Sequence, residues 1–169
     1  MQIRSATAQD VEAIYHLIGE QAAAGQLLPR SYASIVLHLP RFIVVDHENH
    51  IIGTAALHLL DKEMGEIRSL VLDENFRGQG VGKKLVQAVD DLAQSIGLHK
   101  VVSFTRQVAF FQKCGYVMVE KAQLPQKFFL DCIGCEHLMH CDEIALEKVV
   151  GPSGSQREAS ALFFPTVLP

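Results

Sequence analysis

Residues 66–97 read E-I-R-S-L-V-L-D-E-N-F-R-G-Q-G-V-G-K-K-L-V-Q-A-V-D-D-L-A-Q-S-I-G, and this stretch decides the fold that we expect. Its first part predicts a strand, because Ile67 and the run 70–72 are β-branched or apolar. Turn-forming residues at 73–75 then end the strand. The second part predicts a helix whose apolar side chains recur at helical spacing and form one face: Val81, Leu85, Val89, Leu92 and Ile96. Gly97 stands where a left-handed residue commonly ends a helix.

A glycine-rich loop, R-G-Q-G-V-G at 77–82, joins this strand to this helix. Glycine lacks a β-carbon, so backbone amides can approach an anion, and the helix N-terminus adds free N–H groups and partial positive charge. Lys83 and Lys84 place cations in the first helical turn, where they oppose the helix dipole unless an anion offsets them. The loop has neither the G-K-[ST] ending of a P-loop nor the spacing of the dinucleotide fingerprint. It predicts a phosphate site, and an ordinary glycine-rich turn is the alternative.

The composition is that of one soluble globular domain. The 169 residues suffice to bury a core, and 49% apolar with 20% charged residues is an ordinary balance. A net charge of −4 argues against non-specific nucleic-acid binding. No apolar run reaches the ~18–20 residues that span a bilayer, and the first ten residues lack the apolar core of a signal peptide. We expect a cytoplasmic protein without nucleic-acid or membrane partners, with a domain at 1–150 and a linker and apolar tail at 151–169.

The flanking segments predict the other elements. Before the central strand we expect a strand at 3–4, a helix at about 11–24, a short helix between Ser31 and Pro40, and strands at 42–45 and 51–60 around a hairpin loop at 46–50. After the central helix we expect a strand at 100–104, a helix at 107–114, a strand at 116–119, a helical turn at 124–130 and a strand at 142–150. The hairpin strands should form an antiparallel meander. The strand–helix–strand unit should pair in parallel with a right-handed crossover.

The glycine loop is similar to the R/Q-x-x-G-x-G/A loop of the GCN5-related N-acetyltransferases, with Arg77, Gly80 and Gly82 at its fixed positions. The predicted order of elements is also that of this family. The resemblance implies an α+β (α/β-like) fold, a mixed central sheet with splayed strands flanked by helices. It also implies acetyl-CoA as the cosubstrate. Its pyrophosphate would lie on Arg77, Gly78, Gln79, Gly80, Val81 and Gly82, and its pantetheine on the backbone of Leu70, Val71 and Leu72.

Further stretches resemble the short, single-domain N-acetylglutamate synthases, which are amino-acid N-acetyltransferases of arginine biosynthesis. They are L-L-P-R-S at 27–31, A-A-L-H at 55–58, E-I-R-S-L at 66–70, F-F-Q-K-C-G-Y at 110–116, L-P-Q-K at 124–127 and D-C-I-G-C-E-H-L-M-H-C-D-E-I-A at 131–145. The resemblance covers about residues 1–149. It implies direct transfer of acetyl from acetyl-CoA to the α-amine of L-glutamate, the first step of arginine biosynthesis, without an acyl-enzyme.

Several cationic residues are candidates for binding the acceptor. A dicarboxylate amino acid needs cationic partners, and the planar fork of arginine binds carboxylates through two hydrogen bonds. Arg30 resembles the family arginine of L-L-P-R-S, and a solvated surface arginine is the alternative. Arg68 lies with Ser69 on the central strand beside the expected transfer point, and Lys127 is a further candidate. We therefore expect the acceptor to contact Arg30, Arg68, Ser69 and Lys127.

Glu66 is the candidate catalytic residue. An amine attacks only when neutral, and an α-amino group has a pKa near ~8, so a base that removes a proton helps near neutral pH. Glu66 resembles the general base of the family. It lies two residues from Arg68, on the same strand face. The alternative is therefore a structural ion pair with Arg68 or a lysine.

Many relatives carry a tyrosine where this chain has Phe110 and Phe111. This departure removes the obvious acid for the CoA thiolate. A thiolate with a pKa near ~8.5 either leaves without full protonation or takes a proton from water.

The cysteines raise the question of a metal. Cys132 and Cys135 form a C-x-x-C pair, and with Cys141 and His140 they have the residue types of a Cys₃His zinc site. A second C-x-x-C pair is missing, so buried thiols or a reversible disulfide between the paired cysteines are the alternatives, and no metal is favoured. Cys114 lies at a helix C-terminus, which disfavours a thiolate, and its expected role is packing.

Two other functions stay open on the residues alone. One is an acetyltransferase that acts on another small-molecule amine or on a protein. The other is a non-catalytic CoA-binding module. The residues do not fix the oligomeric state, and a homodimer is one option.

Overall fold

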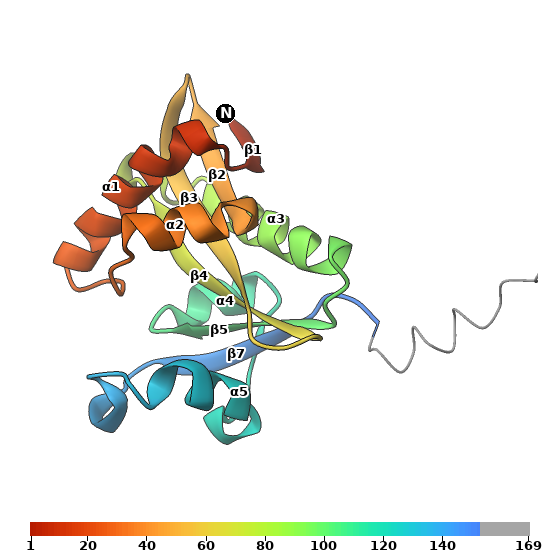
Figure 1. Cartoon of the computed structure of the whole chain (residues 1–169). Coiled ribbons are helices and arrows are strands. Elements are labelled where there is room, and N and C mark those ends of the chain that lie inside the picture. Colours follow the sequence, from red (N-terminus) through yellow and green to blue (C-terminus); the bar gives the residue numbers. More distant parts are fainter. Residues whose placement is uncertain (153–169) are drawn as a thin grey trace, which may run out of the picture.

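The computed structural model describes residues 1–152, so most of the predicted tail at 151–169 lies outside the described residues. A mixed sheet of seven strands has the order β1-β2-β3-β4-β5-β7-β6, with helices on both faces (Figure 1). The elements are β1 Gln2–Ser5, α1 Val11–Ala23, α2 Tyr32–His38, β2 Phe42–His47, β3 His50–Leu59, β4 Met64–Leu72, α3 Val81–Ser95, β5 Lys100–Thr105, α4 Val108–Lys113, β6 Val117–Met118, α5 Pro125–Lys127 and β7 Ile144–Val149. The predicted order of strands and helices is confirmed. No helix among residues 1–152 has the length and apolar character needed to cross a bilayer.

Strands β1 to β4 form the predicted antiparallel meander. The hairpin between β2 and β3 is tighter than the loop predicted at 46–50, because β2 runs on to His47 and β3 begins at His50. Glu48 and Asn49 make the turn with φ of 53° and 64°. Positive φ at both central residues is the geometry of a two-residue hairpin turn, and a twisted antiparallel pair favours it.

A bulge interrupts β4 at its centre. Ser69 has a φ of 52°, and the pairing register with β3 shifts between Thr54 and Ala56. One extra residue in a strand reverses the alternation of its faces. Accordingly Ile67 packs on the α3 side of the sheet and Val71 on the α1 side, although both positions are odd-numbered.

Strands β4 and β5 pair in parallel over a short length only. The paired residues are Met64 with Lys100, Gly65 with Val101 and Glu66 with Val102. Beyond Glu66 the remainder of β4 has no β5 partner, while β5 continues to pair with β7 up to Thr105. The predicted splaying of these two strands is confirmed, and it begins at Glu66.

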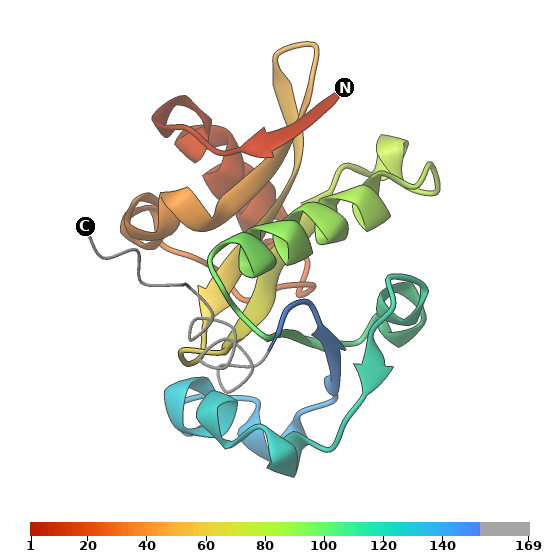
Figure 2. The same cartoon turned by 90° about the vertical axis from the view of Figure 1, so that its right-hand side faces the viewer.

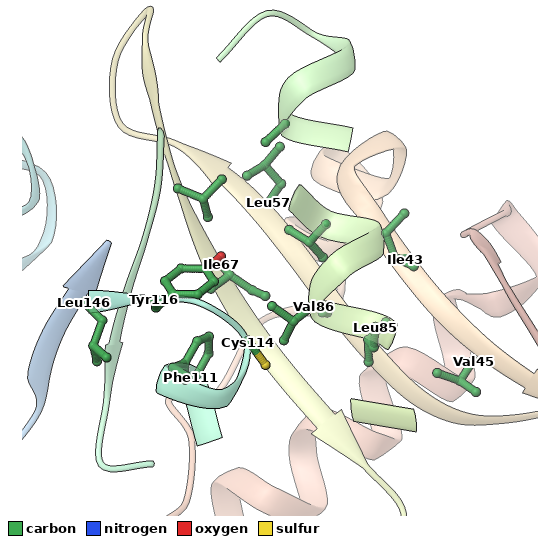
Figure 3. Close-up of a cluster of buried hydrophobic side chains, with 14 of the residues drawn as sticks. Ile43, Val45, Leu57, Ile67, Leu85, Val86, Phe111, Cys114, Tyr116 and Leu146 are labelled. Atoms are coloured by element: carbon green, nitrogen blue, oxygen red, sulfur yellow. The ribbon is translucent and has the colours of Figure 1, made fainter. Parts of the chain in front are cut away.

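Two apolar layers cover the sheet. On one face, Ile14 and Ile18 of α1 and Ile35 of α2 pack against Phe42 and Val44. On the other face, side chains of α3 and α4 pack with those of the strands in a second cluster (Figure 3), and Figure 2 shows α3 lying across this face. Labelled in Figure 3 are Ile43, Val45, Leu57, Ile67, Leu85, Val86, Phe111, Cys114, Tyr116 and Leu146. The packing role predicted for Cys114 agrees with its burial, which raises the pKa of its thiol.

A buried polar network fixes α3 to β7. Tyr116 donates its hydroxyl hydrogen to Asp90 Oδ1 at 2.6 Å, and Lys148 Nζ donates to Asp90 Oδ2 at 2.7 Å. Tyr116 and Asp90 are each 2% exposed. Buried polar groups are costly unless they are hydrogen-bonded, and here each has a partner. The network therefore ties α3, the helix that follows the glycine loop, to β7, which lies next to the edge strand β6.

We expect Asp10→Asn to lower the free energy of unfolding by about 2 kcal/mol at pH 7. Asp10 accepts hydrogen bonds from Arg4 Nη1 at 2.7 Å and Nη2 at 3.0 Å, and from the Thr7 amide at 2.7 Å. The hydrogen bonds from Arg4 are the main reason why the pKa of Asp10 falls from 3.8 to about 2. A lowered carboxyl pKa contributes stability above the unfolded pKa, and this contribution is lost as the pH falls from about 4 to about 2. Urea unfolding at pH 7 and at pH 2.5 checks this, and an equal deficit at both values would contradict it.

Candidate functional site

The glycine loop presents open backbone at the start of α3. Gly78 and Gly80 have φ of +77° and +79°, and a β-carbon built on either would meet no atom within 4 Å. Gly80 is the N-cap of α3. Gln79 Nε2 donates to the Asn75 carbonyl at 3.0 Å, and Arg77 Nε donates to the Leu72 carbonyl at 3.2 Å, so both side chains brace the loop. Exposed Lys83 and Lys84 follow. Left-handed glycines before a helix N-terminus form the kind of cradle that suits a phosphate.

Val81 and Gly82 of the predicted loop site also contribute to the packing of α3. Val81 is 5% exposed and packs into the core, which anchors the first turn of α3. Gly82 lies against the Phe110 ring, since a β-carbon on it would be 3.3 Å from the ring. Larger side chains at position 82 would therefore push on Phe110.

The exposed edge of β4 lies beside the loop. Residues 67–72 extend past the last pair with β5, so their backbone on that side has no strand partner in the described part of the chain. The side chains of Leu70 and Leu72 pack toward α3, and Val71 is buried on the opposite face. A strand edge of this kind offers amides and carbonyls to an extended ligand. Leu70, Val71 and Leu72 thus stand in a position consistent with the predicted pantetheine contacts.

A cluster of opposite charges surrounds Glu66 at the point where the strands part. Glu66 is 3% exposed. Lys127 Nζ donates to its two carboxylate oxygens at 2.8 and 3.0 Å, and Arg68 Nε donates to Oε2 at 2.6 Å. Lys127 reaches this point from α5 and also lies 5.1 Å from the centre of the Phe104 ring. The structure therefore brings three of the predicted residues together. The same geometry also agrees with the alternative interpretation, in which Glu66 forms a structural ion pair with Arg68 and Lys127.

Arg30, in the segment between α1 and α2, lies within electrostatic range of the same cluster. Its pKa is lowered by burial first and then by the positive charge of Arg68, and Glu66 opposes this lowering. Its guanidinium carbon lies 5.5 Å from the centre of the Phe42 ring. Within residues 1–152 no carboxylate pairs with Arg30, in contrast to Arg68 and Lys127. An open depression of about 400 Å³ borders Arg30 on its α1 side, but neither Glu66 nor Arg68 lines it.

Sequence reasoning missed three ionisable residues of this cluster. Asp131 pairs with Arg68 and with Lys127, the latter at 3.1 Å, and the i,i+4 spacing from Lys127 on a helical turn was a usable signal. Glu143 lies near Lys127 and Glu66, and burial raises its pKa. His58 stands directly across from Glu66 in the β3–β4 ladder. Burial and then Arg68 lower the pKa of His58 to about 4, so its ring is neutral near pH 7, and its buried Nδ1 has no hydrogen-bond partner within residues 1–152.

The remaining residues considered in the sequence analysis are Ser69 of β4 and the pair Phe110 and Phe111 of α4. Ser69 is the left-handed residue of the β4 bulge and is half-buried. Phe110 contacts the start of α3, and Phe111 is 3% exposed in the core. Tyr116 does not replace the missing tyrosine, because its hydroxyl is buried against Asp90.

The cysteine segment does not assemble a metal site in the described structure. No three His, Cys, Asp or Glu side chains within residues 1–152 are placed to hold a metal ion together. Cys132 and Cys135 are half-buried free thiols, and Cys141 is exposed, with Lys121 Nζ 3.2 Å from its sulfur. His140 is exposed on a 3₁₀ turn.

Comparison with known proteins places these features in a family. The model of the acetyltransferase (GNAT) family matches residues 11–116. An uncharacterized N-acetyltransferase of Chlorobaculum tepidum is 35% identical over 148 residues, which cover 88% of this chain and 96% of that protein. The amino-acid acetyltransferase of Pasteurella multocida is 32% identical over 127 residues, 74% of this chain. The match spans only 29% of the length of that longer protein.

Solved structures share the fold. Rv2747 of Mycobacterium tuberculosis, in complex with CoA, has a TM-score of 0.74 at 24% identity, over 88% of this chain and 99% of that one. N-acetylglutamate synthase of Neisseria gonorrhoeae, with coenzyme A and N-acetyl-glutamate, has a TM-score of 0.76 at 22% identity, over 88% and 35% of the two chains. The cradle at 77–82 and the splayed strands fit acetyl-CoA, the cosubstrate of such enzymes. The chain belongs to the acetyltransferase (GNAT) family.

Proposed function

We propose that this acetyltransferase moves acetyl from acetyl-CoA to the α-amine of an acidic amino acid, L-glutamate, and so acts as an N-acetylglutamate synthase. One observation carries the proposal. Two cationic side chains from separate segments, Arg68 and Lys127, donate to the buried Glu66 at the parting of β4 and β5, and a third, Arg30, lies within electrostatic range of Glu66 and Arg68. A monocarboxylate or an amine without carboxylates would not need this concentration of cations. The Pasteurella protein is an amino-acid acetyltransferase and the Neisseria protein an N-acetylglutamate synthase, and both support the same acceptor class.

Arg30 supports the acceptor assignment most directly. It is the cation of the cluster that has no carboxylate partner within residues 1–152, and it lies close enough to Arg68 for the two charges to oppose each other. Like charges held together in a half-buried place are unfavourable until an anion joins them. A carboxylate of the acceptor would relieve this repulsion and accept paired hydrogen bonds from the guanidinium.

Glu66 is the proposed general base. The ammonium of the acceptor must lose one proton before its nitrogen can attack, and a second proton passes to solvent water as the amide forms. The Glu66 carboxylate would accept the first proton, because it is the buried anion at the head of the splayed strands. Acetyl-CoA supplies an acetyl thioester when bound. The carbon–sulfur bond breaks as the carbon–nitrogen bond forms, and the thiolate leaves without a tyrosine donor at 110 or 111.

The residues proposed to hold acetyl-CoA lie next to this centre. Backbone amides of the loop 77–82 would bind the pyrophosphate, and Lys83 and Lys84 would add charge. The open edge of β4 at 70–72 would pair with the pantetheine, and an amide there would polarise the thioester carbonyl.

The proposal is tested by following release of the CoA thiol with a thiol reagent. The purified full chain is mixed with acetyl-CoA and with L-glutamate, L-aspartate, L-glutamine or no acceptor, and a blank without substrate removes the signal of the four cysteines. We expect release that depends on the acceptor and is fastest with L-glutamate. Tight CoA binding without release for any amino acid would refute the proposed reaction and favour another acceptor or a non-catalytic module.

A further inference from the structure

Asp131 lies among the cations that we assign to the acceptor. It stands on a π-helical turn, Phe128–Cys132, directly after α5. Its carboxylate pairs with the Arg68 guanidinium and, at 3.1 Å, with Lys127 Nζ. Burial would raise the pKa of Asp131, but Arg68 and Lys127 outweigh it and hold the pKa below its ordinary value. Asp131 is therefore an ionised carboxylate bound by two of the three cations proposed for the substrate.

Glu66 and Asp131 share these cations unequally. The Glu66 side chain is 4% exposed, whereas that of Asp131 is 33% exposed. Glu66 is fixed within a central strand, and Asp131 is carried by a turn whose neighbours Phe129 and Leu130 are 71% and 56% exposed. Single π-helical turns are rare and occur frequently at functional sites. Asp131 is therefore the member of the pair that can be displaced from the cations.

The number of carboxylate partners of each cation in the cluster also points to Asp131. Arg30 has no carboxylate partner within residues 1–152, while Arg68 and Lys127 each have two. An acceptor with two carboxylates can place one on Arg30 without competition. Its other carboxylate has to compete for Arg68 and Lys127 with the carboxylate of Asp131.

We propose that Asp131 is an internal ligand that competes with the side-chain carboxylate of the acceptor for Arg68 and Lys127, and thereby sets the affinity for acidic acceptors. This inference rests on the proposed function and specifies how its substrate is selected. Asp131 acts through the two cations and is a specificity-determining residue, not a catalytic one. It should weaken the binding of L-glutamate, and it should affect L-glutamine little, because the neutral amide does not replace a carboxylate on the cations.

The substitution Asp131→Asn tests this competition, because it removes the charge and keeps the shape of a side chain that is one third exposed. If Asp131 leaves Arg68 and Lys127 free in about one tenth of the molecules, the apparent dissociation constant of the acceptor is raised about tenfold. We therefore expect Asp131→Asn to lower the KM for L-glutamate by about tenfold. The KM for L-glutamine and for acetyl-CoA should stay unchanged. Asp142→Asn is the matched control, since Asp142 pairs with Arg106 and not with Arg68 or Lys127, and its side chain is 64% exposed.

Calorimetric binding of glutarate separates this inference from the proposed function. Glutarate has two carboxylates and no amine, so its binding does not depend on turnover. We expect it to bind Asp131→Asn about tenfold more tightly than the natural chain. Tighter binding together with no acetyl transfer to L-glutamate would refute the proposed function and leave the competition standing. Equal or weaker binding of glutarate to Asp131→Asn, or no binding to either protein, would overturn the competition. An unchanged or raised KM for L-glutamate would overturn it as well.

Discussion

Glu66→Gln is expected to lower kcat with L-glutamate by about 10²- to 10⁴-fold, the range that general-base catalysis contributes. Glutamine keeps the shape of the buried side chain but cannot take a proton from the ammonium of the acceptor. The loop 77–82 is untouched, so the KM for acetyl-CoA should not change. Initial rates at saturating acetyl-CoA, with CoA binding measured separately, check both statements.

A pH profile separates a base from an ion pair that only supports the structure. Lys127 and Arg68 both donate to Glu66, so the glutamine variant could lose activity by releasing these cations. If Glu66 is the base, the deficit should shrink as the pH rises above the pKa of the acceptor amine, since the solvent then supplies neutral amine. A purely structural loss would be the same at every pH.

Glu147→Gln is the matched control for this experiment. Glu147 pairs with Lys100 at 2.8 Å, and its side chain is 22% exposed, so the same chemical change is made at a comparable ion pair outside the cluster. This variant should keep its kcat. The base assignment is wrong if Glu66→Gln retains kcat within about twofold, or if the two variants lose activity alike.

The order of elements could be predicted because local patterns specify it. Ser31 accepts a hydrogen bond from the Ser34 amide at the start of α2, and Gly97 and Gly115 have φ of +88° and +89° after α3 and α4. Such caps depend on residues close in sequence. The splaying of β4 and β5 came from the resemblance to the family, not from periodicity.

The parts that could not be predicted depend on tertiary contacts or on strained backbone. Ser69 adopts a positive φ, which the identity of a serine does not predict. The bulge at Ser69 places the side chains of Ile67 and Val71 on opposite faces of the sheet. Asp131 reaches Arg68 across 63 residues of sequence through a π-helical turn. Likewise, the pairing of His58 with Glu66 depends on the strand register that the turn between β3 and β4 sets.

Arg30→Ala is expected to raise the KM for L-glutamate by about 10- to 100-fold with little change in the KM for acetyl-CoA. Hydrogen bonds to a charged group contribute about 1.5–3 kcal/mol, and each 1.4 kcal/mol is a factor of ten. Arg30 lies over the Phe42 ring and makes no ion pair within residues 1–152, so its removal leaves no protein carboxylate without its partner. The fold should therefore keep most of its stability, which a thermal melt checks.

Two further variants decide whether the guanidinium itself is needed at position 30. Arg30→Lys keeps the charge but replaces the planar fork with a single ammonium, so its KM for L-glutamate should lie between those of the natural chain and Arg30→Ala. Arg41→Ala removes an arginine from the 3₁₀ turn after α2 and should leave the KM unchanged. The loss for L-glutamine should be as large as that for L-glutamate, because the side-chain carboxylate is proposed to bind Arg68 and Lys127, so that Arg30 binds the α-carboxylate that both acceptors share. A KM in Arg30→Ala equal to that of the natural chain would place Arg30 outside the acceptor site, and Arg68 and Lys127 would then have to bind both carboxylates against the competition of Asp131.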